Sequence, residues 1–207
     1  MMVTWVRGAF KDVHGRVNWD LDDCMETTFE GEIDATKLWT GEPTRDAHLR
    51  SADFFDIENH PSITFSGRFV ERVGSTHFKG VADLTIRETM RAVPLDIAYL
   101  GQWRTPYWEG DENKGEMTRI GFELSTRVNR HDFGVSWNDE LPRGGVVVSN
   151  EVAIAIDVEA ILDDDLRAVG LDDAVYAGVA SYPSAPRQRR TRSIASRSIG
   201  PGGRRSA

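Results

Sequence analysis

The stretch VAIAIDV (152–158) decides the fold class, because its apolar and polar residues alternate with a period of two. Its β-branched residues fall on one side of an extended chain, and Asp157 falls on the other. Alternation of this kind indicates a β-strand with one buried and one solvent-facing side. The same pattern returns along residues 28–160, so we expect a domain built from strands.

Turn-rich segments separate the predicted strands. EGDENKG (109–115) and LPRGG (141–145) are typical turns, and they indicate an antiparallel all-β domain. Apolar residues recur at helical spacing between Thr44, a helix-capping residue type, and Pro61, so we expect one short helix over 44–58. Alternation alone does not distinguish a two-sheet sandwich from a closed barrel, whose interior is filled by side chains or by one ligand.

Charge divides the chain of 207 residues into unequal parts. The formal net charge is -8, but residues 183–207 contain seven Arg and no acidic residue, which leaves 18 basic and 33 acidic residues in 1–182. The acidic balance argues against a dedicated nucleic-acid-binding protein. The composition of 183–207 is too polar to bury a core, so we predict a disordered Arg-rich tail there. We expect the barrel or sandwich domain over 1–165 and a short helix over 166–182.

The sequence carries no motif for hydrolysis or nucleotide binding. The patterns G-x-S-x-G, G-x-x-x-x-G-K-[ST] and H-E-x-x-H are absent. The five His residues lack the spacing of metal ligands, and Cys24 follows Asp22 and Asp23, whose charges oppose thiolate formation. We therefore expect no catalytic residue, no metal, no cofactor and no enzymatic activity.

The chain as written begins MMVTWVRGAFKDV (1–13), which lacks the apolar run of a secretory signal. No apolar run approaches the roughly 18 residues of a transmembrane helix. The single Cys24 cannot form an intramolecular disulfide. We therefore expect a soluble cytoplasmic protein, or a periplasmic or secreted one if the natural start lies upstream of Met1.

Three segments closely resemble the YceI-like family of polyisoprenoid-binding proteins: RDAHLRSADFFDIENHPSITFSG (45–67), VNRHDFGVSWN (128–138) and GGVVVSNEVAIAIDVEAI (144–161). The segment FKGVADLTIRETMRAVPLDI (78–97) fits the family more loosely. The resemblance implies a lipocalin-like antiparallel barrel of about eight strands. It also implies non-catalytic binding, sequestration or transport of a long isoprenoid, such as a polyprenyl lipid or a quinone tail, in an apolar cavity.

An isoprenoid chain forms no hydrogen bonds, so its site needs a dry channel of apolar side chains and a polar mouth. The inward-facing residues of the predicted strands, with three Phe near one end, are the candidate ligand wall. They are Phe29, Ile33, Phe54, Phe55, Ile63, Phe65, Leu84, Ile86, Leu95, Ile97, Phe122, Leu124, Phe133, Ile154 and Ile156. The residues alone favour an ordinary packed core, whereas the resemblance favours the ligand wall.

Polar residues near the same end are candidates for contact with an anionic head group. They are Arg45, His48, Arg50 and Arg130. Arg50 and Arg130 equally fit a different role, in which either pairs with Asp53 or Asp132 and locks a turn.

The chain departs from the family pattern at two places. Family members usually open with a further strand before the segment that corresponds to VRGAF (6–10). Either the natural start lies upstream of Met1, or the barrel lacks its first strand and leaves an unpaired edge, which favours association into a dimer or aggregation. Relatives also tend to carry Gly near Glu88, where a turn with positive φ would strain a larger residue.

The alternative function is that of a packed scaffold whose tail RQRRTRSIASRSIGPGGRR (187–205) contacts anionic lipid, nucleic-acid phosphate or a protein partner. The partners we expect are an isoprenoid lipid, a second copy of the chain and, through the tail, a membrane surface. We expect no specific nucleic acid.

Overall fold

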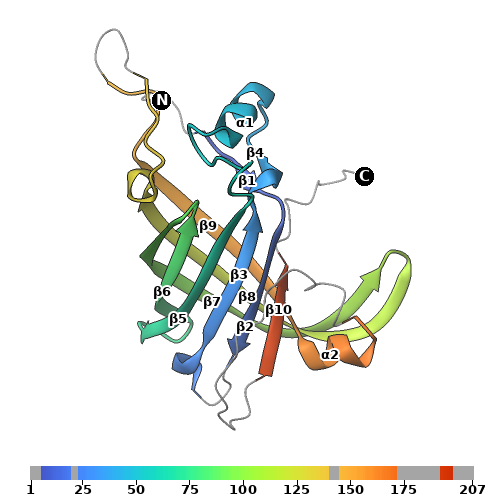
Figure 1. The fold of residues 1–207 in the computed structure, drawn as a ribbon. Coiled ribbons are helices and arrows are strands. Elements are labelled where there is room, and N and C mark those ends of the chain that lie inside the picture. The colour runs from blue at the N-terminus through green and yellow to red at the C-terminus, as the bar shows by residue number, and fades with distance from the viewer. Residues whose placement is uncertain (1–5, 20–22, 140–144, 172–191, 198–207) are drawn as a thin grey trace, which may run out of the picture.

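The computed structural model describes residues 6–19, 23–139, 145–171 and 192–197. These residues form an antiparallel sheet that curls into a barrel with the strand order β10-β2-β3-β5-β6-β7-β8-β9 (Figure 1). Its strands are β2 (Val13–Trp19), β3 (Thr28–Asp34), β5 (Ser62–Arg72), β6 (His77–Ile86), β7 (Thr89–Glu109), β8 (Glu112–Asn129), β9 (Glu151–Leu162) and β10 (Arg192–Arg197). Short 3-10 helices connect the strands: η1 (Cys24–Glu26), η2 (Ala35–Lys37) and η3 (Arg130–Phe133). The prediction of an antiparallel, lipocalin-like barrel is confirmed.

A small second layer covers one end of the barrel (Figure 1). It consists of the ribbon of β1 (Ala9–Phe10) and β4 (Leu38–Trp39), followed by α1 (Pro43–Arg50). Glu42 caps α1 by accepting hydrogen bonds from the backbone N–H groups of the first turn, and these bonds hold the pKa of its carboxyl below the usual range.

The helix predicted over 44–58 is correct only in its first half. α1 ends at Arg50, and Ser51 caps it in an extended conformation, with its N–H and its hydroxyl both donating to the carbonyl of His48, the hydroxyl at 2.8 Å. Turns follow, and the N–H of Phe55 reaches back to the carbonyl of Leu49 at 3.0 Å. These turns direct Phe54 and Phe55 toward the barrel core instead of continuing the helix.

The second helix, α2 (Asp163–Ala168), follows β9 and lies outside the barrel against the β7–β8 hairpin (Figure 1). Its Leu166 packs against Met117, and Gly170, at φ +74°, turns the chain beyond its end. The helix therefore begins before the predicted range of 166–182, of which residues 172–182 lie outside the described residues. No helix in the described part of the chain is long and apolar enough to cross a membrane.

β10 corrects the prediction of a wholly disordered tail over 183–207. Its backbone pairs with β2 along Arg192–Arg197 and with β9 along Ile194–Arg197. The strand therefore covers part of the edge that the sequence predicts to be unpaired. Composition does not reveal it, because this short polar segment contains too few apolar residues to show alternation. The rest of the predicted tail, 183–191 and 198–207, lies outside the described residues.

An aromatic cluster fills the end of the barrel opposite α1. The ring of Trp19 stacks on that of Tyr99 with centroids 5.1 Å apart, and Phe122 contacts both rings at 5.5 and 5.7 Å. Phe69 and Phe78 lie against each other at 4.9 Å. Burial raises the pKa of the Tyr99 hydroxyl. We call these five residues the aromatic floor.

We predict that Phe122→Ala lowers the free energy of unfolding by about 3–5 kcal/mol, through lost burial and the void left behind. Phe122 is 3% exposed and lies at the centre of the floor. Urea unfolding monitored by circular dichroism measures the change. The control is Trp108→Ala at a residue 59% exposed, which we expect to change stability by no more than about 0.5 kcal/mol. Equal effects of the two substitutions would contradict this role of the floor.

Candidate ligand cavity

The inner face of the barrel surrounds a cavity of about 2660 Å³. The cavity extends from Phe69 and Phe122 of the aromatic floor to α1 and the turns after it, which we call the cap. All the residues predicted as ligand wall line it: Phe29, Ile33, Phe54, Phe55, Ile63, Phe65, Leu84, Ile86, Leu95, Ile97, Phe122, Leu124, Phe133, Ile154 and Ile156. Alternation located them because every second side chain of a paired strand faces the lumen. Their role in binding stays a prediction.

Two Phe–Gly pairs keep the lumen open along β3 and β5. Phe29 lies directly opposite Gly67, and Phe65 lies directly opposite Gly31. A Cβ atom on either glycine would come within 2.4 Å of the Cζ atom of the opposite ring. Each ring therefore lies over the backbone of the neighbouring strand. The two rings therefore add aromatic surface to the cavity wall without projecting across the centre of the barrel.

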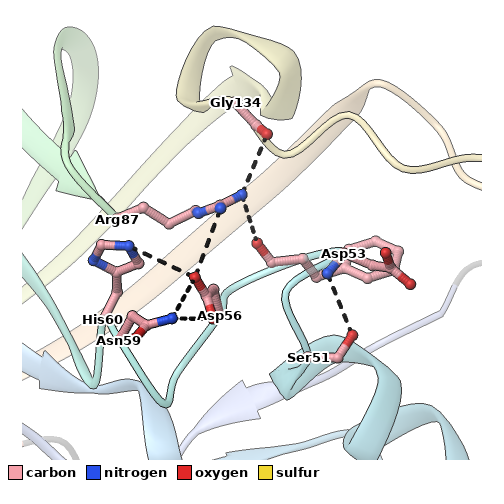
Figure 2. A network of polar contacts seen from close by, with 8 residues as sticks. Ser51, Asp53, Asp56, Asn59, His60, Arg87 and Gly134 are labelled. Carbon is pink, nitrogen blue, oxygen red and sulfur yellow. Dashed lines mark hydrogen bonds and ion pairs between the residues drawn. The ribbon is translucent and has the colours of Figure 1, made fainter.

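A polar network fastens the turn at the base of the cap (Figure 2). Asp56, at φ +50°, accepts hydrogen bonds from Asn59 Nδ2 at 3.1 Å. The same carboxylate has Arg87 Nη2 and His60 Nε2 at 3.8 Å each. The carboxylate is half-buried, and the Arg87 guanidinium together with the hydrogen bonds from Asn59 stabilises it and holds a strained backbone position in place.

Arg87 links this turn to the neighbouring loops (Figure 2). Its Nη1 donates to the carbonyl of Phe54 at 3.5 Å and to that of Gly134 at 3.4 Å. Arg87 itself has φ +57° in the β6–β7 turn. The residue with positive φ is thus Arg87 and not Glu88. The backbone strain that we expected at Glu88 therefore lies at Arg87.

Arg130, a candidate for head-group contact, borders the cavity and also holds backbone segments together. Its guanidinium donates to the carbonyls of Ser149 (2.9 Å), Val135 (2.9 Å), Trp137 (2.7 Å) and Val148 (3.5 Å). No carboxylate in the described residues pairs with it, so the predicted alternative of an ion pair is wrong. Burial lowers the pKa of the guanidinium, and four of its five N–H groups donate to the two loops that it joins.

The other two arginines predicted for the head group differ from each other. Arg45 lines the cavity, and it donates from Nε to Thr40 Oγ1 at 2.8 Å and from Nη2 to the Thr40 carbonyl at 3.0 Å. Arg50 donates to the carbonyl of Leu38 and lies outside the cavity lining. Arg45 therefore remains a head-group candidate, and Arg50 is a structural residue.

His48 lies in the cavity lining at the cap. Its Nε2 is 2.9 Å from Asp53 Oδ2. Its ring meets those of Phe54 and Trp137 edge to face, with centroids 5.0 and 4.5 Å apart. The imidazole is thus a polar group held in place beside the aromatic rings at the cap.

Several lining residues are absent from the set predicted from sequence. Val93 and Val128 follow the same alternation as their neighbours, so the pattern could have located them. Residues 6–11 and 146–150 also border the cavity, and they carry no periodic signal because they belong mainly to irregular segments. The described residues contain no group of three or more His, Cys, Asp or Glu side chains able to hold a metal ion.

We predict that Arg130→Lys lowers the free energy of unfolding by about 3 kcal/mol, because a lysine cannot reproduce the fork that satisfies these buried carbonyls. Arg130 is 6% exposed. Guanidinium unfolding measures the loss. The control is Arg127→Gln, at an exposed ion pair with Glu151, whose effect we expect to stay below about 1 kcal/mol. Full stability of Arg130→Lys would contradict the structural role.

Comparison with known proteins agrees with the resemblance seen in the sequence. A UPF0312 protein of Serratia proteamaculans is 30% identical over 158 residues, covering 76% of this chain and 74% of that protein. A UPF0312 protein of Staphylococcus epidermidis is 28% identical over 164 residues, covering 79% of this chain and 89% of that protein.

Solved structures show the same fold. The Campylobacter jejuni YceI protein matches with a TM-score of 0.61 and 25% identity, over 78% of this chain and 87% of that one. Burkholderia cenocepacia BcnA matches with a TM-score of 0.61 and 19% identity, over 77% of this chain and 90% of that one. The family model described as the YceI-like domain matches residues 1–160. The chain therefore belongs to the YceI-like family.

Proposed function

We propose that the protein binds a long isoprenoid chain, such as a polyprenyl lipid or a quinone tail, in the barrel cavity, to sequester or carry it without chemistry. The observation that carries this proposal is the apolar wall that runs from the aromatic floor to the cap. An isoprenoid chain offers no hydrogen bonds and is recognised by apolar contact alone, which this wall supplies.

The size of the cavity favours a long ligand. Its volume of about 2660 Å³ exceeds the roughly 300–1,000 Å³ of ordinary small-molecule pockets. Each buried carbon contributes about 0.8 kcal/mol, hence about 4 kcal/mol per five-carbon unit before ordering costs are subtracted. Affinity therefore rises with each added isoprene unit until the wall is covered.

The cap is the polar end of the cavity. Arg45, His48 and Arg130 border the cavity there, and Arg50 does not. Arg130 donates to four backbone carbonyls, whereas Arg45 donates to one. We therefore assign the head group to the Arg45 and His48 end and the tail to the floor.

The direct test is to purify the protein without detergent, extract it with organic solvent and identify the extract by mass spectrometry. We expect a prenyl lipid in stoichiometric amount, or stoichiometric uptake of an added one. Repeated absence of both would rule the proposal out.

We predict that Ala82→Trp lowers the affinity for a prenyl chain at least tenfold. Ala82 is 4% exposed and lines the cavity between Gly67 and Val93. An indole in the lumen displaces at least two carbons of the ligand, which corresponds to about 1.6 kcal/mol. Titration with a fluorescent geranylgeranyl probe measures the affinity.

The matched control is Ala92→Trp. Ala92 lies next to Val93 on β7, but it is exposed and absent from the cavity lining. We expect its affinity for the probe to equal that of the unmodified protein. Equal losses in the two variants would contradict binding inside the barrel.

A further inference from the structure

The ribbon of β1 and β4 carries exposed apolar residues that also border the cavity. Val6, just before β1, and Trp39 of β4 are both exposed, and both belong to the cavity lining. Figure 1 shows this ribbon beside α1 at one end of the barrel. Apolar surface therefore continues from the outside of the molecule to the cavity wall at the end where the head group is assigned.

Trp39 is held in a defined position although it is 48% exposed. Its backbone pairs with Ala9 of β1, and Lys11 Nζ lies 4.5 Å from the centroid of its ring. A Cβ atom on Gly41 would come within 3.3 Å of its Cζ2 atom, so the ring lies against the chain at Gly41. The fold thus presents an indole at the surface without burying it. Trp is enriched at membrane–water interfaces, because its ring is apolar and its N–H is polar.

Exposed cations flank this indole. Arg7, Lys11 and Lys37 are all exposed, and the N–H of Lys11 donates to the carbonyl of Lys37 at 3.3 Å, which sets the two lysines side by side on the ribbon. No carboxylate in the described part of the chain pairs with any of the three. We call Val6, Arg7, Lys11, Lys37 and Trp39 the rim.

The carboxylates near the rim are engaged within the fold. Asp12 lies 2.6 Å from the ring of His14. Asp34 and Glu42 accept hydrogen bonds from backbone N–H groups at the starts of η2 and α1, and Asp46 is buried. The unpaired charges of the rim are therefore positive, although the whole chain has a net charge of -8.

The terminal segments do not alter this sign. Residues 1–5 and 198–207 lie outside the described residues, and neither segment contains an Asp or a Glu. They supply no carboxylate side chain that could neutralise the three cations.

The combination of residues in the rim fits an anionic bilayer surface. Nucleic-acid phosphate calls for cations but gives exposed valine and tryptophan nothing apolar to contact. A bilayer offers lipid phosphates and, just below them, hydrocarbon. Lysine side chains suit this boundary, since the ammonium stays among the head groups while the methylene groups lie along apolar surface.

We propose that the rim docks the protein onto an anionic lipid bilayer, with Trp39 at the level of the head groups and with Arg7, Lys11 and Lys37 on lipid phosphates. This proposal rests on the proposed function, because a prenyl ligand resides in membranes. Docking in this way turns the Arg45 and His48 end of the cavity toward the bilayer that holds the ligand.

The test measures co-sedimentation of the full chain with two kinds of vesicle, phosphatidylcholine alone and an equal mixture of phosphatidylcholine and phosphatidylglycerol. Neither contains a prenyl lipid. We expect binding to the mixed vesicles to be at least tenfold tighter and to weaken with added salt. Removing the three charges with Arg7→Gln, Lys11→Gln and Lys37→Gln should lower binding to the mixed vesicles at least tenfold, since each cation near an anionic surface contributes roughly fivefold.

The matched control removes the same charge elsewhere, with Arg72→Gln, Lys79→Gln and Arg104→Gln. These exposed residues lie on β5, β6 and β7, and none borders the cavity. We expect this variant to bind the mixed vesicles as the unmodified protein does. Every variant keeps the arginines of 183–207, so a loss confined to the rim variant does not come from that tail.

A second pair of variants tests the apolar contact. Trp39→Ala should weaken binding to the mixed vesicles severalfold. Trp108→Ala, at a residue that is more exposed but does not border the cavity, should leave it unchanged.

Equal binding to both kinds of vesicle, equal losses in the two charge variants, or equal effects of Trp39→Ala and Trp108→Ala would overturn docking by the rim. Full binding by the rim variant would overturn it too, and would assign the contact to the tail. No binding of the unmodified protein to either vesicle would also overturn it, and would leave an acidic protein as the partner.

The proposed function is judged separately, by binding of a fluorescent geranylgeranyl probe in solution without vesicles. Probe binding without vesicle binding overturns the docking surface alone. Vesicle binding through the rim without probe binding overturns the proposed function and keeps the docking surface.

Discussion

Closure of the barrel depends on backbone pairing at one seam, the one between β9 and β2. These strands do not pair with each other in the described part of the chain, and an open strand edge leaves rows of donors and acceptors without partners. β10 supplies partners near the aromatic floor and stops at Glu159 of β9. Pairing of β10 with both strands thus closes the sheet at this end of the seam.

A large cavity needs a wall that resists collapse, because protein interiors otherwise pack closely. Phe29 and Phe65 lie over glycines of the opposite strand, so their bulk is taken up within the sheet. At the cap, Arg130 and Asp56 join loops through hydrogen bonds and ion pairs. These polar contacts fix the positions of loops that border the cavity.

Period-two alternation allowed the strands and the inward-facing wall to be predicted, since burial on one side of a strand leaves a direct mark on the sequence. The end of α1 could not be predicted from the sequence pattern, because the turns around Ser51 are held by local hydrogen bonds. β10 escaped prediction because backbone pairing places it, and pairing leaves little mark on composition. The carbonyl partners of Arg130 could not be predicted for a related reason: a charged residue shows that partners are needed, not whether they are ligand atoms or carbonyls.

Under the proposed function, ligand and seam act on one equilibrium. An empty cavity leaves its wall without partner atoms, so the closed barrel lacks contacts that a bound chain would supply. A ligand that binds the closed form adds its binding free energy to the stability of that form. Because Ile154, Ile156 and Val158 of β9 border the cavity, part of that free energy falls on the strand next to the seam. A bound chain is therefore expected to stabilise the short pairing of β10 with β9.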